Sequence, residues 1–292
     1  MHLLLMMQVA GKVIPVRDPP AEELLHLIQV HSVTTLSGVG AHCFSELLRE
    51  SPRGGNINSL ARVGVHGVAL RADLVKDIHA RFPGVELGTG YGLTETSGSI
   101  SLATSVDFEQ RPGTSGAVVP SVEIQVVDEN GRKMPAGALG DIELRGAMLM
   151  SGYCNPPEAN ARAFRDGWFR TGDVGSFDND GFLTVSDRRG HLIRLAGKVF
   201  SGSEIERVAI ESGLVADAAA LQISTASGTE RLLLAVVAAP ETLDPGTSLG
   251  QTLNDSLGVA PGLVTILPMQ RLPRLQSGKL DRLALQAEGT TH

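Results

Sequence analysis

The stretch that decides the fold is GTGYGLTET, residues 88–96, which follows a short apolar run at residues 85–87. An apolar run that enters a glycine-rich segment predicts a strand followed by a tight turn, because glycine has no Cβ and accepts positive φ. Such a turn lets a ligand come close to the backbone. Tyr91 then offers a flat aromatic face, and Thr94 and Glu95 offer a hydroxyl and a carboxylate to phosphate and a hard cation. The alternative is a purely structural turn with a capped helix after it.

Upstream of this stretch, strand patterns alternate with helix patterns. Apolar residues recur at helical spacing in residues 21–31, 41–50 and 69–82, and the predicted strands are residues 32–40, 60–67 and 85–92. This alternation predicts a parallel sheet whose ligand lies at the carboxyl ends of the strands. Both GTGYGLTET and the segment 66–70 lie at such ends.

Beyond residue 111 the sequence changes to short strands of alternating polarity. Residues 122–134 surround Asn130-Gly131 and predict a hairpin, and two further strands follow at 138–146 and 181–188. We expect a small antiparallel, barrel-like unit with Trp168, the only tryptophan, in its core. The tail then predicts an independent α+β unit. Its predicted elements are a hairpin at 191–200, helices at 202–213, 249–258 and 279–287, and strands at 217–224, 231–240 and 263–270.

Composition limits the class of protein. At ~150 residues per domain, the 292 residues predict about two domains. The net charge of −7 argues against nonspecific binding to nucleic acid. Cys43 and Cys154 fit no metal spacing and suit a reducing cytoplasm, where we expect the protein to be located. The apolar residues 3–7 are too few to cross a bilayer, so we expect no membrane span.

GTGYGLTET resembles the Tyr-Gly-x-Thr-Glu signature of the adenylate-forming superfamily, which contains acyl-CoA synthetases, luciferases and the adenylation domains of peptide synthetases. Other segments resemble further motifs of this superfamily in the same order along the chain. They are HGVAL at 66–70, GYCNPPEANARAFRDGWFRTGD at 152–173, SDR at 186–188, AGKVFSGSEIE at 196–206 and PRLQSGKLDR at 273–282. The resemblance covers nearly all of this chain, whereas the chain covers only the carboxyl-terminal part of the family's fold.

The resemblance implies a fold class and a domain organisation. We expect an α/β and α+β protein, made of the C-terminal part of a large parallel-sheet plus β-barrel domain and a small mobile α+β domain. The first would be a partial AMP-binding domain at residues 1–187, with a parallel α/β part at 1–111 and a barrel-like part at 112–187. The second would be a lid domain at residues 188–292.

The resemblance also implies a site for ATP and AMP. Asp173 would bind both ribose hydroxyls through its two acceptor oxygens, although an aspartate after Thr-Gly is usually only a turn residue. Arg188 would reach the ribose and the α-phosphate, Thr94 would bind the phosphates, and Glu95 would hold Mg²⁺. The remaining nucleotide-binding residues would be Gly67, Val68, Ala69, Gly90, Tyr91 and Gly92, with Tyr91 against the adenine.

Further roles follow from the same resemblance. Asp187 would be the hinge whose dihedral angles absorb a rotation of the last domain. Gly197 and Lys198 would border the CoA site, with the pantetheine arm passing over Gly197. Lys279, otherwise a solvent-exposed lysine, would act with Thr94 and Glu95 as a catalytic residue and offset the repulsion between the substrate carboxylate and the α-phosphate.

Two departures from the family pattern limit these implications. Gly190-His191 stands where a lysine and an aspartate usually follow the hinge, so the hinge interaction of that lysine is in question. The family's phosphate loop, a Ser/Thr/Gly run that ends in Pro-Lys, is absent: residues 96–105 contain no Pro-Lys, and residues 224–231 end in Glu-Arg. We therefore expect a truncated chain that is impaired alone, or a second chain that supplies the missing N-terminal half.

Three hypotheses for the function stay open. The first is an AMP-forming acyl-CoA synthetase that joins a fatty acid or a related small-molecule carboxylate to CoA with consumption of ATP. The second is an adenylation enzyme that loads a carrier protein. The third is a non-catalytic module or partner subunit that binds nucleotide or CoA.

Overall fold

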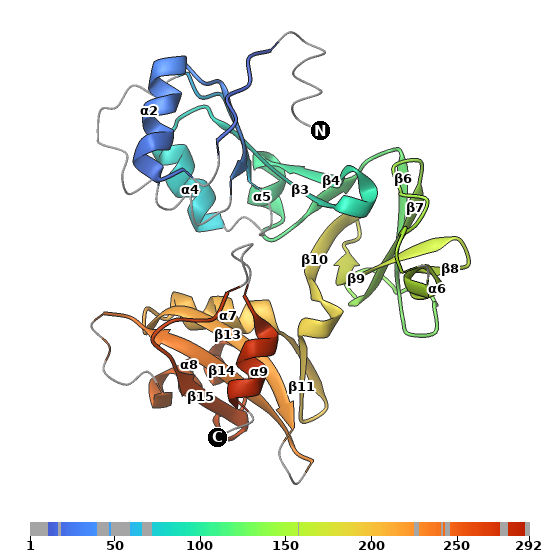
Figure 1. The fold of residues 1–292 in the computed structure, drawn as a ribbon, viewed down its shortest axis with the longest axis vertical. Helices are drawn as coiled ribbons and strands as arrows, with labels where there is room; N and C mark the ends of the chain where they lie inside the picture. Colours follow the sequence, from blue (N-terminus) through green and yellow to red (C-terminus); the bar gives the residue numbers. More distant parts are fainter. Residues whose placement is uncertain are drawn as a thin grey trace. The chain divides into compact units, whose positions relative to one another are not determined.

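The computed structural model describes most of the chain, and its contacts separate two units (Figure 1). The described residues are 11–16, 19–39, 47, 59–65, 72–156, 158–224, 228–240, 242, 246–274 and 280–289. The first unit comprises Met1–Thr171 and Gly175–Val185, and the second comprises Gly172–Val174 and Ser186–His292. The domain limits expected from the sequence, 1–187 and 188–292, stay predictions.

The first unit begins with the parallel sheet that the alternating pattern predicts. Strands β1 (Thr35–Val39), β2 (Arg62–Val65) and β3 (Glu86–Leu93) pair in this order and run parallel. Helices α2 (Ala21–His31), α4 (Ala72–Arg81) and α5 (Ser105–Gln110) accompany them. Ile28, Ile78 and Phe108, one from each helix, are fully buried in one apolar core with residues of β2 and β3. The helix expected at 41–50 lies outside the described residues, apart from Leu47.

Strand β3 confirms the strand expected at residues 85–92 and extends through the glycine-rich run, so the tight turn also expected at these glycines is wrong. The turn comes later, at the 3₁₀ segment η1 (Thr94–Thr96), and β4 (Gly98–Thr104) then returns antiparallel to β3. A Cβ on Gly90 would lie 2.8 Å from the carbonyl oxygen of Ser101, and one on Gly92 would lie 2.3 Å from that of Gly98. Glycine is therefore needed here because the backbone of β4 occupies the space of a side chain.

The antiparallel strands that follow continue the same sheet. They are β5 (Gly116–Val118), β6 (Val122–Val127), β7 (Gly140–Gly146), β8 (Phe164–Arg165), β9 (Trp168–Phe177) and β10 (Phe182–Arg188), and α6 (Glu158–Ala163) precedes β8. The strand order is β1-β2-β3-β4-β5-β10-β9-β7-β6, with β8 paired to β9. Of the hairpin predicted around Asn130-Gly131, the structure shows the antiparallel bridge Val127↔Lys133. The longer antiparallel partner of β6 is β7, in a register that runs from Val122↔Gly146 to Val127↔Asp141.

The expectation that Trp168 lies in a core is wrong. Trp168 is only half-buried, and the guanidinium of Arg145 lies 4.5 Å from the centre of its ring. Its neighbour Phe169 is 2% exposed and packs with Ile100 and Leu144 instead. Successive residues of a strand point to opposite faces, so only one of the two rings reaches the core.

The second unit is the α+β unit expected from the tail. A hairpin of β11 (Leu192–Leu195) and β12 (Lys198–Ser201) follows the 3₁₀ segment η2 (Arg189–His191). In the main sheet, β13 (Val215–Ser224) pairs antiparallel with β14 (Glu230–Ala238), and β15 (Val264–Pro268) pairs parallel with β14. The helices are α7 (Gly202–Glu211), α8 (Gly246–Leu257) and α9 (Arg282–Gly289), and the 3₁₀ segment η3 (Pro261–Leu263) leads into β15.

Helices cover both faces of this second sheet (Figure 1). One set of alternate strand residues, which includes Ala220 and Leu234, packs with apolar residues of α7 and α8. The other set, which includes Leu221 and Leu233, packs with Leu285 of α9. Both sets are buried, which explains why the central residues of these strands, 218–221 and 232–238, are continuously apolar. In the part of the chain that the structure describes, no helix is both long enough and apolar enough to cross a membrane.

Candidate active site

The carboxylate of Glu95 is the first feature of the candidate site. The segment η1 places Glu95 directly after β3, and Tyr153 donates a hydrogen bond from its hydroxyl to Glu95 Oε1 at 2.7 Å. The buried side chain of Thr96 stabilises the turn, because its hydroxyl donates to the carbonyl of Gly98 at 2.7 Å. Thr94 is exposed beside them, so η1 presents one hydroxyl and one carboxylate in sequence.

Tyr91 lies on β3 just before this turn. It is half-buried and packs against two apolar clusters of the first unit, one around Ile100 and Leu144 and one around Ile142 and Leu183. A ring held in this way keeps a fixed orientation. An aromatic ring of fixed orientation suits stacking with a planar base, because little side-chain freedom is lost when the base binds.

The residues around Glu95 fit Mg²⁺ only if a ligand brings further oxygens. The described part of the chain contains no group of three or more His, Cys, Asp or Glu side chains that could hold a metal ion. Mg²⁺ is commonly bound by one or two carboxylates together with substrate phosphates. Glu95 has acceptor sites beyond the hydrogen bond from Tyr153, since a carboxylate offers about four lone pairs. The donor set therefore fits a Mg²⁺ ion that arrives with ATP.

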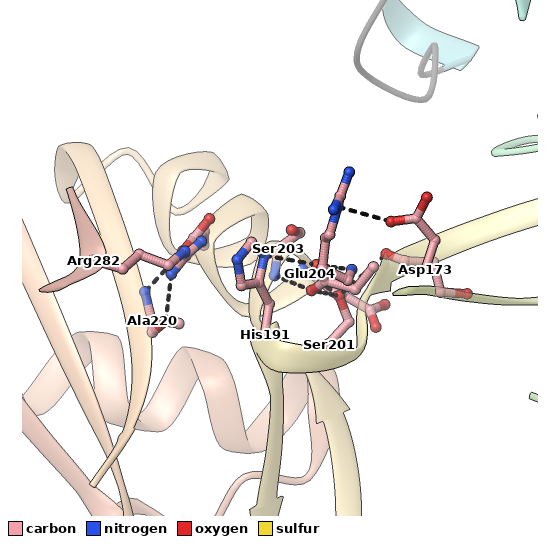
Figure 2. A network of polar contacts seen from close by, with 11 residues as sticks. Asp173, His191, Ser201, Ser203, Glu204, Ala220 and Arg282 are labelled. Atoms are coloured by element: carbon pink, nitrogen blue, oxygen red, sulfur yellow. Dashed lines mark hydrogen bonds and ion pairs between the residues drawn. The ribbon is translucent and has the colours of Figure 1, made fainter. Parts of the chain in front are cut away.

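In the second unit, Asp173 and Arg188 form an ion pair. Asp173 lies on β9 and is 5% exposed, and Arg188 ends β10. Arg188 Nε lies 2.9 Å from Asp173 Oδ1, while 58% of the Arg188 side chain is exposed. Figure 2 shows this contact at one end of a polar network. The pair joins a rigid buried carboxylate to a cation that reaches solvent.

Asp187 lies in the same network and is held by several donors. Its carboxylate accepts hydrogen bonds from the Ser201 hydroxyl at 2.9 Å and from the backbone N–H of Ser203 at 3.0 Å. The backbone N–H of Arg188 donates at 2.7 Å, and His191 Nδ1 lies 3.2 Å from Asp187 Oδ1 (Figure 2). The side chain of the expected hinge residue is therefore fixed within the second unit.

These donors control the ionisation of Asp187. Burial of the carboxyl would raise its pKa, but the hydrogen bonds from His191, from the backbone of Ser203 and Arg188, and from Ser201 outweigh burial and hold the pKa of Asp187 well below its ordinary value. Asp187 is thus a carboxylate at neutral pH. His191, which departs from the family motif, contacts the carboxylate of Asp187, the expected hinge residue, directly.

Gly197 and Lys198 lie at the tip of the β11–β12 hairpin. Ala196 and Gly197 form its two-residue turn with φ values of 48° and 78°, the left-handed region that such turns need. A Cβ on Gly197 would meet no atom within 4 Å, so the space above this residue is open. Open space above a glycine permits the close approach of a flexible ligand chain, as expected for pantetheine.

The expected site residues fall into three groups. The first unit contains Gly90, Tyr91, Gly92, Thr94 and Glu95, and the second contains Asp173, Asp187, Arg188, Gly197 and Lys198. Gly67, Val68, Ala69 and Lys279 lie outside the described residues. That all three groups meet at one nucleotide stays a prediction.

Sequence reasoning missed the residues that hold the expected ones in place. Tyr153 was part of a recognised motif, but its contact with Glu95 joins residues 58 positions apart and has no local signal. Ser201 and Ser203 lie at the start of α7, where a serine predicts a helix cap. Ser201 does cap α7, since its hydroxyl accepts from the N–H of Glu204, and the same hydroxyl also donates to Asp187.

Comparisons with known proteins show which family the chain resembles along its sequence. A family model described as "AMP-binding enzyme" matches residues 1–154. 4-Coumarate–CoA ligase 5 of Oryza sativa subsp. japonica is 29% identical over 292 residues, which is 98% of this chain and 54% of that protein. Indoleacetate–CoA ligase of Aromatoleum aromaticum is 28% identical over 263 residues, which is 90% of this chain and 51% of that protein.

A solved structure confirms the expected fold class. The structure of o-succinylbenzoate CoA synthetase from Bacillus subtilis, in complex with its acyl-adenylate intermediate, matches with a TM-score of 0.87 at 26% identity. The match covers 98% of this chain and 57% of that one. The chain therefore spans about half the length of these relatives.

Proposed function

Because this chain belongs to the AMP-binding enzyme family, we propose that it acts in the AMP-forming activation of a carboxylate and its transfer to CoA. In this reaction the carboxylate attacks the α-phosphorus of ATP, pyrophosphate leaves, and an acyl-adenylate forms. The thiol of CoA then attacks the carbonyl carbon and AMP leaves. The three relatives are CoA ligases or synthetases by name, which supports CoA over a carrier protein as the acceptor.

We propose an acid that contains an aromatic ring as the substrate, rather than the fatty acid expected first. The relatives are named for coumarate, indoleacetate and o-succinylbenzoate, which all contain one. A cytoplasmic location belongs to the same proposal, because Cys154 is a free and exposed thiol that suits a reducing compartment.

The proposed mechanism divides the work among a few side chains. Asp173 accepts hydrogen bonds from the ribose hydroxyls, and Arg188 faces the α-phosphate. Tyr91 stacks on the adenine, and Thr94 donates its hydroxyl to a phosphate oxygen. Glu95 would supply one oxygen to Mg²⁺, and the bound ion would neutralise part of the phosphate charge. Lys279 brings a positive charge between the two anions that must react.

The observation that supports this proposal best is the pair of Asp173 and Arg188. The Asp173 carboxylate is 5% exposed and so loses most of its hydration. Buried carboxylates of this kind are usually found next to a positive charge that compensates for the lost water. The guanidinium of Arg188 holds one oxygen at 2.9 Å and is itself largely exposed. An acceptor fixed next to an exposed cation matches the two polar parts of AMP, a diol and a phosphate.

Binding of AMP to the 292-residue chain tests the nucleotide site. Isothermal titration calorimetry should give a Kd for Asp173→Ala at least ~10-fold above that of the unchanged chain, because hydrogen bonds to a charged acceptor contribute about 1.5–3 kcal/mol. Asp255→Ala, on the exposed side of α8, is the matched control and should leave the Kd unchanged. Equal affinities of Asp173→Ala and Asp255→Ala would contradict the ribose role.

Exchange of pyrophosphate into ATP tests the chemistry. The panel is 4-coumarate, indoleacetate, o-succinylbenzoate and palmitate. Exchange with an aromatic acid, abolished by Lys279→Ala, would support the whole proposal and would overturn the expectation that this chain is impaired alone. Binding of AMP without exchange would reduce the proposal to a nucleotide-binding module. A thioester on a carrier protein, with none on free CoA, would favour the carrier-loading alternative.

A further inference from the structure

The carboxylate of Glu95 lies at the end of a chain of hydrogen bonds. Tyr153 donates from its hydroxyl to Glu95 Oε1 at 2.7 Å. A backbone hydrogen bond joins the same two segments, because the N–H of Met150 donates to the carbonyl of Glu95 at 2.8 Å. The segment 147–156, between β7 and α6, therefore holds both the side chain and the main chain of Glu95.

Asn160 fixes Tyr153 in turn. The N–H of Tyr153 donates to Asn160 Oδ1 at 2.7 Å, and Asn160 Nδ2 donates to the carbonyl of Tyr153 at 2.9 Å. This reciprocal pair joins the segment to α6. Gly152 makes room for it, since a Cβ there would lie 3.0 Å from Asn160 Oδ1 and its φ is +148°.

The ring of Tyr153 is fixed as well. It is half-buried and packs against the apolar cluster of Ile100, Leu144 and Phe169. Backbone, ring and hydroxyl are therefore each held by a different group. A hydroxyl with so little freedom defines the position of the carboxylate that it contacts.

We propose that Tyr153 and Asn160 are positioning residues that aim the Glu95 carboxylate at the Mg²⁺ ion that accompanies ATP, an inference that rests on the proposed function. The bond from Tyr153 makes the two carboxylate oxygens inequivalent and removes rotamer freedom before the metal arrives. Mg²⁺ demands near-ideal octahedral geometry, so a carboxylate fixed in advance favours its binding. Partners of metal-binding side chains typically contribute about 10- to 100-fold in metal affinity.

Binding of Mn²⁺ in the presence of ATP tests this role on the 292-residue chain. Mn²⁺ accepts the same oxygen ligands as Mg²⁺, and electron paramagnetic resonance detects it directly. Tyr153→Phe, which removes only the hydroxyl, should raise the Kd of Mn²⁺ about 10-fold, at the low end of that range. The Kd of AMP without metal should stay within about twofold, since AMP binding does not use Glu95 in the proposed site.

The asparagine has its own variant and control. Asn160→Ala should raise the Kd of Mn²⁺ by at least about threefold, because it acts through Tyr153 rather than on Glu95 itself. Asn254→Ala, in α8 of the second unit, removes an amide of the same kind and should leave the Kd of Mn²⁺ unchanged. Equal effects of the two alanine variants would count against a specific role for Asn160.

Glu95→Gln separates this inference from the proposed function. Weaker Mn²⁺ binding in Glu95→Gln, with no change in Tyr153→Phe, refutes the positioning role and leaves Glu95 as a ligand. No change in either variant, or no Mn²⁺ binding by the unchanged chain with ATP, overturns both. If Tyr153→Phe loses affinity for AMP as strongly as for Mn²⁺, the hydroxyl supports the unit in general, and the inference is also overturned.

Discussion

Arg282 joins three elements of the second unit, and its replacement by alanine should destabilise that unit by about 2–3 kcal/mol. Its guanidinium donates to Glu206 Oε1 of α7 at 2.8 Å and to the carbonyl of Ala220 on β13 at 2.8 Å. The N–H of Ala220 also donates to Glu206 Oε1 at 2.9 Å. Figure 2 shows Arg282 of α9 beside Ala220, so one side chain connects α9, α7 and β13.

The magnitude follows from the burial of the pair. Removal of one partner from a buried ion pair costs about 3–5 kcal/mol, because the other charge stays desolvated. The side chains of Arg282 and Glu206 are 23% and 18% exposed, so water compensates part of this cost. The matched control is Arg207→Ala on α7, where Arg207 makes more exposed pairs with Glu204 and Glu211. That control should cost less than about 0.5 kcal/mol.

The loss of unfolding free energy in Arg282→Ala should also depend on pH. Burial raises the pKa of Glu206, although the charge and hydrogen bond of Arg282 and the N–H of Ala220 oppose this. A carboxyl group with a raised pKa contributes stability below its unfolded pKa, near 4.5, and the contribution is lost as the pH rises through the folded pKa. Without Arg282 this pKa rises further. The deficit of Arg282→Ala should therefore be largest near neutral pH and shrink towards pH 4.5.

Urea unfolding followed by circular dichroism measures this deficit, and hydrogen exchange in α7, β13 and α9 locates it. The double variant Glu206→Gln with Arg282→Met should recover more than half of the lost free energy, because neither charge is left unpaired. Equal free-energy losses in Arg282→Ala and Arg207→Ala would refute the reasoning. A free-energy loss in Arg282→Ala that is the same at neutral pH and at pH 4.5 would refute it as well.

Three further predictions concern stability. Hydrogen bonds lower the pKa of Asp187 against the effect of burial, so this carboxylate stabilises the folded state above its ordinary pKa of 3.8, and the stabilisation is lost as the pH falls below that value. Asp187→Asn should therefore make the unfolding free energy, measured in urea, less dependent on pH in the acid range. Gly92→Ala should lower the thermal midpoint clearly, since its Cβ would lie 2.3 Å from a carbonyl oxygen of β4, whereas Gly88→Ala, at 3.7 Å, should be tolerated. In Gly202→Ala the new Cβ would lie 2.7 Å from the carbonyl oxygen of His191, which should lower the unfolding free energy by about 1–3 kcal/mol. In Gly190→Ala the Cβ meets no atom within 4 Å, so the unfolding free energy should change little. Equal thermal midpoints for the two variants of either glycine pair would contradict the argument.

The sequence by itself determined the order and type of most described elements. The apolar strands β13 and β14, the two-residue turn at Ala196-Gly197 and the helical spacing of α2 and α4 are signals confined to a few neighbouring residues. Such signals can be read from the sequence because the periodicity of a helix or strand, or a positive φ, restricts which residue types fit at neighbouring positions. The motifs around Glu95 and Asp173 also pointed to the family that the comparisons then gave.

Only the tertiary structure decided which distant side chains contact one another. Glu95 meets Tyr153 across 58 positions, and Arg282 meets Glu206 across 76. Strand register likewise decided that the glycines of β3 face the backbone of β4 and that Phe169, not Trp168, is buried. Contacts between distant residues depend on how sheets pair and helices pack, and no periodicity within a segment records that choice.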